Sequence, residues 1–191
     1  MSKEVLISIK SKWCEKIISR EKTVEVRKRK PTLDTPFRCY IYCTVGNPTL
    51  NIPISDERLK ADVAVNGMMS MNCPIGNGKV IGEFACDWIK EYDSAFSEWA
   101  YQVAPPGSVM PMHEEAAFRM MYDDACLTPD DIDEYFGDED FRVHLWHISD
   151  LVIYDEPKTL KEMRFMSTAY TPWHWIVHPP QGWCYAEKYE E

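Results

Sequence analysis

Hydrophobic and polar positions form three short patterns at the start of the chain. Residues 5–9 (VLISI) are largely β-branched and apolar, which predicts a strand. Ser11 is a capping residue, and it opens a stretch, 11–21, with apolar side chains at helical spacing. These apolar positions are Trp13, Cys14, Ile17 and Ile18. Residues 23–27 (TVEVR) alternate with a period of two, so we expect strand, helix and strand in this order.

The two faces of the strand 23–27 differ in chemistry. Val24 and Val26 share one face and are suited to a core, whereas Thr23, Glu25 and Arg27 share the other. A carboxylate between basic side chains is suited to holding a ligand, but it is equally suited to an ion pair that only stabilises the strand. Both interpretations stay open on the residues alone.

The remaining patterns predict a mixed α+β domain that spans 1–191. We expect an insertion at about 44–75, rich in Pro and Asn, and a helical segment at about 94–137. Gly82 lies inside an apolar strand and indicates a bulge or a sharp bend. Further strands are predicted over 37–44, 79–87, 141–157 (one long or two adjacent strands) and 179–189, and helices over 94–103, 112–126, 128–136 and 158–165.

Three blocks of sequence resemble one known family. Lys22, Glu25 and Arg27 form a K-x-x-E-x-R pattern after a helix, which resembles the signature of the ASCH domain. The blocks GNGKVIGEFACD (76–87) and WHISDLVIYDEPKTLKE (146–162), the latter running on to PPQGWCY (179–185), are similar to phage and prophage-type members. The resemblance implies a PUA-like mixed β-barrel with peripheral helices and a role linked to RNA. The family usually has Gly before the signature, where this chain has Arg20.

Charge is unevenly distributed along the chain. Residues 1–30 hold ten Lys and Arg against four Glu, a net of +6, while the whole chain carries −10. Residues 31–191 therefore carry −16, which argues against general duplex binding, because that binding depends on neutralising phosphates. A single basic region is still suited to a short strand, a nucleotide or a phosphate.

Two groups of residues are candidates for such a ligand. Lys12 and Trp13 at the start of the first helix would join Lys22, Glu25 and Arg27, with the cations meeting phosphate or a base carbonyl and Glu25 accepting from a base amino group. Gln181, Trp183 and Tyr185 near the C-terminus are suited to stacking on a base and reading its edge. Aromatic residues on a terminal strand are as readily explained by core packing. We expect an RNA-binding or nucleotide-binding cleft between these elements.

Two other functions remain alternatives. One ASCH branch hydrolyses N4-acetylcytidine with a Lys, a Thr and a distant Glu. Lys22 matches that Lys, but Glu25 occupies the position of the nucleophilic Thr, so Thr23 would have to act as a displaced nucleophile. A hydrolase or ribonuclease using Lys22 and Glu25 as an acid–base pair is the enzymatic alternative. The third reading is a protein-interaction module whose acidic surface mimics nucleic acid.

Metal, redox and membrane functions find little support in the sequence. Cys39 and Cys43 are too far apart on one strand for a single ion, and the pairs His144/His147 and His174/His178 depend on the local geometry. Cys14, in the first helical turn, is a minor candidate for a reactive thiol. Seven cysteines without an even framework favour reduced thiols. We predict a soluble cytoplasmic protein, because no apolar run reaches the length that spans a membrane. We also expect no metal and no cofactor.

Overall fold

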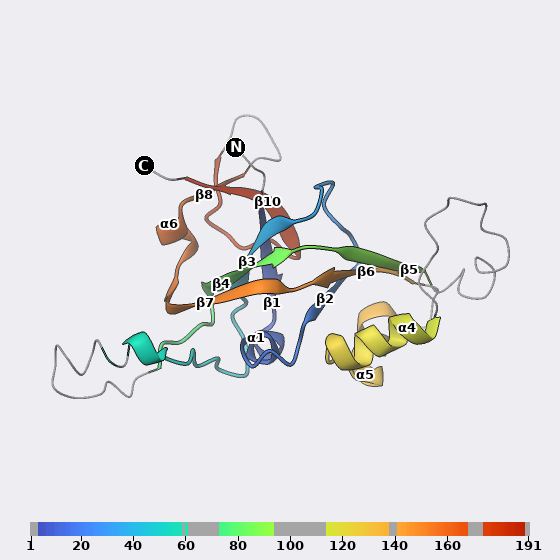
Figure 1. The fold of residues 1–191 in the computed structure, drawn as a ribbon. Coiled ribbons are helices and arrows are strands. Elements are labelled where there is room, and N and C mark those ends of the chain that lie inside the picture. The colour runs from blue at the N-terminus through green and yellow to red at the C-terminus, as the bar shows by residue number, and fades with distance from the viewer. Residues whose placement is uncertain are drawn as a thin grey trace. The chain divides into compact units, whose positions relative to one another are not determined.

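The structure, a computed structural model, describes residues 4–58, 60, 73–93, 114–137, 141–167 and 174–189. It consists mainly of strands with a few short helices (Figure 1). The strands are β1 (Glu4–Ile9), β2 (Val24–Arg27), β3 (Phe37–Cys43), β4 (Lys79–Cys86), β5 (Ile89–Asp93), β6 (Arg142–His147), β7 (Ser149–Lys158), β8 (Phe165–Ser167), β9 (His174–Trp175) and β10 (Trp183–Lys188). The helices are α1 (Ser11–Ile18), α4 (Glu114–Arg119), the π-helical turn η2 (Met120–Asp124), α5 (Pro129–Phe136) and α6 (Leu160–Met163).

Contacts divide the chain into two compact units, and each is described by itself. Unit 1 comprises Met1–Ile18, Phe37–Phe84 and Asp150–Glu191, and unit 2 comprises Ser19–Pro36 and Ala85–Ser149. The strands form a seven-stranded sheet in the order β7-β4-β3-β1-β10-β8-β9 and a three-stranded sheet in the order β2-β6-β5. That the whole chain acts as one domain stays a prediction.

Unit 1 is organised around its first strand. β1 pairs in parallel with β3 and antiparallel with β10, so the sheet is mixed. Leu6 and Tyr40, from β1 and β3, are buried in the core together with Phe165 from β8. The apolar residues of 5–9 are almost fully buried, because a central strand is covered on both faces.

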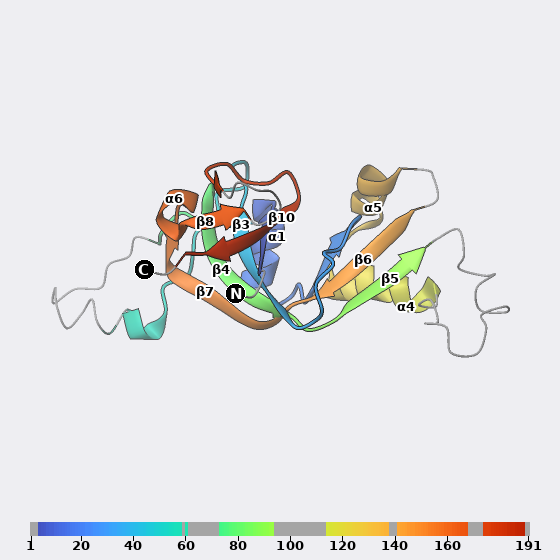
Figure 2. The ribbon, with the colours of Figure 1, turned by 90° about the horizontal axis from the view of Figure 1, so that it is seen from above.

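Unit 2 is a three-stranded sheet with helices on one face. Val24 and Val26 of β2 pack with Leu145 of β6 against Met121 and Ile132 from the helices. Figures 1 and 2 both place α4 and α5 beside this small sheet. The alternation in TVEVR thus has the predicted result, since the valines are buried and the opposite face is left for Glu25 and Arg27.

The backbone at Arg20 and at Gly82 bears on two features noted in the sequence. Arg20 adopts the left-handed conformation, at φ 63°, in the turn between α1 and β2, where glycine would be unstrained. Gly82 on β4 lies against the backbone of β7: an added Cβ would be 2.2 Å from the carbonyl oxygen of Val152. Gly82 therefore permits a close approach of two strands.

The structure confirms most predicted elements and corrects several. The region 141–157 forms two adjacent strands, β6 and β7, one of the two predicted arrangements. The short strands β5, β8 and β9 were not predicted, and the helix predicted over 112–126 contains a π-helical turn. The helix predicted over 94–103 lies outside the described residues. The mixed sheet with peripheral helices is confirmed, and its closure into a barrel stays a prediction.

Candidate nucleic-acid site

Lys22, in unit 2, is a charged residue that is almost completely buried. Its residue surface is only 2% exposed, and its ammonium group donates a hydrogen bond of 2.8 Å to the carbonyl oxygen of Ala125. The Nζ atom also lies 3.4 Å from Oε2 of Glu25. A buried ammonium group is costly unless it is paired and hydrogen-bonded, and Lys22 has both kinds of partner.

Glu25 links Lys22 to a second cation. Its Oε1 lies 2.9 Å from Nε of Arg27, while its Oε2 faces Lys22, so each oxygen meets one cation. The side chain of Glu25 is 8% exposed and that of Arg27 is 12% exposed. We call Lys22, Glu25 and Arg27 the Lys22 triad. It is a fixed carboxylate held between two cations in a mostly buried setting.

Burial dominates the protonation of Lys22. Desolvation lowers the pKa of its ammonium group below the ordinary value, and the nearby carboxylate of Glu25 opposes this shift only in part. A lysine with a lowered pKa gives up its proton more readily than one in water. Such groups concentrate at functional sites, although structural ion pairs also produce them.

Backbone contacts from distant parts of the chain position the triad. The amide of Thr23 donates to the carbonyl of Asp124 over 2.8 Å, and the carbonyl of Thr23 accepts from the amide of Ile148 over 2.8 Å. Immediately after the π-helical turn, the amide of Ala125 donates to the carbonyl of Met120. The end of this turn therefore supplies the carbonyl that Lys22 contacts.

Sequence reasoning missed the residues around the triad. In the β2–β6 ladder, Glu25 lies opposite Trp146 and Arg27 lies opposite His144. Burial raises the pKa of the Tyr135 hydroxyl, with Arg27 and Glu25 close enough to influence it electrostatically. Only the alternation of strand 141–157 could have placed His144 and Trp146 on one face, and no pattern pointed to Ala125 or Tyr135.

The other predicted ligand residues belong to unit 1. Lys12 lies over the ring of its neighbour Trp13, with Nζ 4.4 Å from the ring centre. Trp183 and Tyr185 share one face of β10 as expected, with their rings edge to face at 5.3 Å. Gln181 is exposed just before that strand. A cleft that joins these residues to the Lys22 triad stays a prediction.

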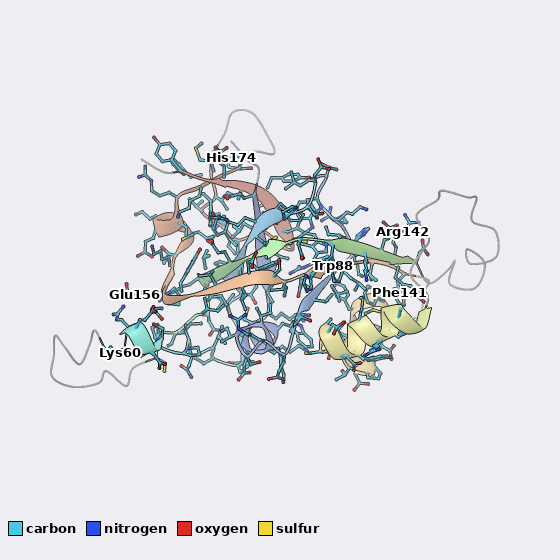
Figure 3. All side chains as sticks on the ribbon, viewed as in Figure 1. Lys60, Trp88, Phe141, Arg142, Glu156 and His174 are labelled. Carbon is cyan, nitrogen blue, oxygen red and sulfur yellow. The ribbon has the colours of Figure 1, made fainter. Side chains whose placement is uncertain are left out.

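Thr23 and the candidate metal-binding histidines His144 and His147 each have identified partners. Thr23 is anchored through both its backbone groups. His147 Nδ1 lies 2.6 Å from Oδ1 of Asp87, and the imidazole stacks on Trp88, labelled in Figure 3, at 4.7 Å. His144 lies 3.5 Å from Glu91.

Among the described residues, no three His, Cys, Asp or Glu side chains lie together in a group that could hold a metal ion. His174 lies on β9, which removes the helical spacing to His178 that a shared metal site needed. Cys14 is buried, with its thiol directed to the carbonyl oxygen of Ile9. Within the part of the chain that is described, no helix is long and apolar enough to cross a membrane.

Comparison with solved structures finds a similar fold in an ASCH protein. The crystal structure of an ASCH protein from Zymomonas mobilis matches at a TM-score of 0.54 and 19% identity, covering 95% of this chain and 86% of that chain. Structures of a Tyr-to-Phe and a Ser-to-Ala variant of the same protein match at TM-scores of 0.51 and 0.53, with 19% and 18% identity, 95% of this chain covered, and 88% and 87% of theirs.

Sequence comparisons add nothing to this likeness. No family model matches the chain, and no curated protein matches it. A particular likeness to phage or prophage members stays a prediction. At 19% identity the comparison speaks to the fold, and on that evidence the chain has the fold of the ASCH proteins.

Proposed function

We propose that this protein is an ASCH-type domain that binds RNA or a nucleotide-like ligand at the Lys22 triad. The observation that carries the proposal is the burial of Lys22 and Glu25, 2% and 6% exposed, in one network with the partly exposed Arg27. Buried ion pairs add little net stability compared with apolar residues of the same volume. Such a network is therefore better explained by ligand binding than by a contribution to the stability of the fold.

Each residue of the Lys22 triad has its own role in the proposed binding. Lys22 already donates to Ala125 and contacts Glu25, so it serves to hold the carboxylate in place. Glu25 accepts from a base amino group, and Arg27 donates to a phosphate or a base carbonyl in the planar geometry that guanidinium provides. The basic character of residues 1–30 favours the approach of an anionic ligand. The fold shared with ASCH proteins supports the same assignment.

Binding of nucleosides, nucleotides and short single-stranded RNAs at low salt tests this proposal. Arg27→Gln and Glu25→Gln should each weaken the best ligand by about 10- to 100-fold, the worth of a hydrogen bond to a charged group. Lys30→Met is the matched control, because Lys30 is half exposed and contacts Glu91 at 3.5 Å. Equal affinities for wild type, Arg27→Gln and Lys30→Met would show that the triad is not the binding site.

Hydrolysis is the second candidate, and one observation favours it. Burial lowers the pKa of the Lys22 ammonium group, which lies beside the carboxylate of Glu25. In its neutral form, a lysine side chain accepts a proton from a nucleophile. Turnover of the tightest ligand separates the two functions. If product forms, its loss in Lys22→Met with ligand binding retained would identify an enzyme, whereas binding without product would identify a binding domain.

A further inference from the structure

Unit 1 contains a second group of side chains suited to binding a nucleic acid, an arginine with two aromatic rings. The guanidinium of Arg164 lies 5.6 Å from the ring centre of Trp175 and 4.9 Å from that of Tyr189. The two rings meet edge to face at 5.7 Å and 89°. We call these three residues the Arg164 cluster. Figure 3 labels His174, the neighbour of Trp175 on β9.

The aromatic rings of the cluster are unusually accessible. Trp175 is 46% exposed and Tyr189 is 44% exposed, and Val177, two residues beyond Trp175, is 62% exposed. Trp and Tyr bury large apolar areas in most folded domains, and here much of that area faces solvent. Partly exposed rings beside a cation are what a flat, anionic ligand requires.

The backbone fixes the cluster through several hydrogen bonds. The amide of Tyr189 donates to the carbonyl of Arg164 over 3.2 Å, and the amide of Ile176 donates to the carbonyl of Phe165 over 2.8 Å. Arg164 itself has φ 52°, the left-handed conformation that glycine adopts without steric cost at the end of a helix. An arginine held in a conformation that favours glycine points to a role for its side chain.

We propose that the Arg164 cluster is a stacking subsite for single-stranded RNA. One base stacks on the exposed face of Trp175 or Tyr189, and Arg164 contacts the adjoining phosphate. The inference rests on the proposed function, and it adds to that function a separate contact for RNA in unit 1. Stacking on aromatic rings tolerates any base, so this subsite contributes affinity and the Lys22 triad contributes selectivity.

Cations and carboxylates both lie near the Arg164 cluster. Lys188 lies opposite Phe165 in the β10–β8 ladder, which places it next to Arg164, and Lys158 and Lys161 belong to the same segment of the chain. The carboxylate of Glu162, on α6, is occupied by the amide and hydroxyl of Thr159. Glu187 lies opposite Met166 in the same ladder, and Met166 lies opposite Trp175, so a carboxylate accompanies these cations. Arg164 beside two partly exposed rings is the feature that suits a base and its phosphate.

The test uses the full chain and fluorescently labelled oligouridylate and oligoadenylate RNAs of increasing length, with anisotropy as the readout. For the longer RNAs, Trp175→Ala should weaken binding by about 5- to 100-fold, the loss expected for one stacked base. Trp175→Phe and Tyr189→Phe keep the rings and should bind nearly as wild type. Uridine monophosphate binding, which reports on the Lys22 triad, should be unchanged in all three.

Arg164→Gly is the variant that separates function from folding. Glycine suits the left-handed backbone, so the melting temperature should not fall, while the loss of one phosphate contact should lower the slope of log affinity against log salt by about 0.7. Arg119→Gln, which removes an 82% exposed guanidinium from α4, controls for the loss of one positive charge and should leave the slope unchanged.

The outcomes distinguish the two proposals. If RNA affinity depends on Arg27 but is the same in Trp175→Ala and Arg164→Gly, the Arg164 cluster is not an RNA subsite while the proposed function stands, and a protein partner becomes its better occupant. If affinity depends on the Arg164 cluster but not on Arg27, the inference holds and the Lys22 triad is misplaced. If no RNA length binds, the inference is wrong, and mononucleotide binding alone decides the proposed function.

Discussion

Removing the charge of Glu25 should destabilise the protein far more than removing the charge of Lys22. Glu25 is the only carboxylate of the Lys22 triad, and both of its oxygens contact cations. In Glu25→Gln, Lys22 and Arg27 would remain mostly buried without the negative charge that both contact. In Lys22→Met, Glu25 keeps Arg27 at 2.9 Å, so the remaining pair is still neutral overall.

The expected magnitudes follow from this asymmetry. Breaking a buried ion pair by removing one partner costs about 3–5 kcal/mol, and we expect about 3 kcal/mol for Glu25→Gln because Gln keeps the shape. Lys22→Met leaves the Ala125 carbonyl without its donor, at a cost of about 1–3 kcal/mol, but it also removes the desolvation penalty of a buried ammonium group. The two effects oppose each other, so we expect a net change within about 1 kcal/mol.

Urea unfolding and thermal melting measure the difference. For a chain of this size, a loss of 3 kcal/mol lowers the melting temperature by roughly 6–12 °C. Glu91→Gln is the matched control: Glu91 lies on the same sheet and meets Lys30 and Arg142, each at 3.5 Å, but it is 40% exposed. Its loss should cost less than about 1 kcal/mol, because solvent screens exposed pairs.

Global charge acts against the predicted order. The chain carries −10, so Glu25→Gln reduces its self-repulsion and Lys22→Met increases it. If net charge governed stability, Glu25→Gln would be the more stable variant. Equal losses in Glu25→Gln and Glu91→Gln would also refute the reasoning, since they would show that burial of the Lys22 triad has no energetic consequence.

Three further predictions concern single positions. Burial lowers the pKa of Lys22 in the folded protein, so between that lowered pKa and 10.5 the unfolded chain binds more protons than the folded chain. The stability of wild type relative to Lys22→Met should therefore rise with pH through this range, as measured by urea unfolding. Gly82→Ala places a Cβ 2.2 Å from a backbone oxygen and should lower the free energy of unfolding by about 2–3 kcal/mol, the upper part of the overpacking range. Arg20→Gly should raise the melting temperature, with a gain of about 0.5–1 kcal/mol, because φ 63° strains a residue with a Cβ; unchanged melting would show that the side chain offsets this strain.

The sequence predicts those elements that carry their own pattern. A β-branched apolar run predicts β1, helical spacing predicts α1 and alternation predicts β2. The predicted helix over 128–136 is α5, and the side chain of Thr128 caps it. β5 reads IKEYD, mostly polar, and β8 has three residues, so each depends on pairing with a partner strand. Tertiary pairing of this kind leaves no local signal.

The candidate site was only partly predictable for the same reason. Alternation placed Glu25 and Arg27 on one face, and the structure brings them into contact. The acceptor of Lys22 lies 103 residues away, at Ala125, after a π-helical turn that no spacing of apolar residues indicated. The Arg164 cluster was equally hidden, because it joins the end of α6 to β9 and to the residue after β10, and no local spacing indicates these contacts.

Backbone strain and buried charge coincide at the Lys22 triad. Arg20, two residues before Lys22, and Cys126, immediately after Ala125, both have positive φ angles, at 63° and 54°. The two turns that deliver the ammonium group and its acceptor are therefore strained, and the ion pairs between them add little net stability. A chain selected only for a stable fold gains from glycine at such turns and from an apolar side chain in place of Lys22. Because neither is present, the arrangement supports the proposal that a ligand needs this carboxylate and its cations held in a fixed geometry.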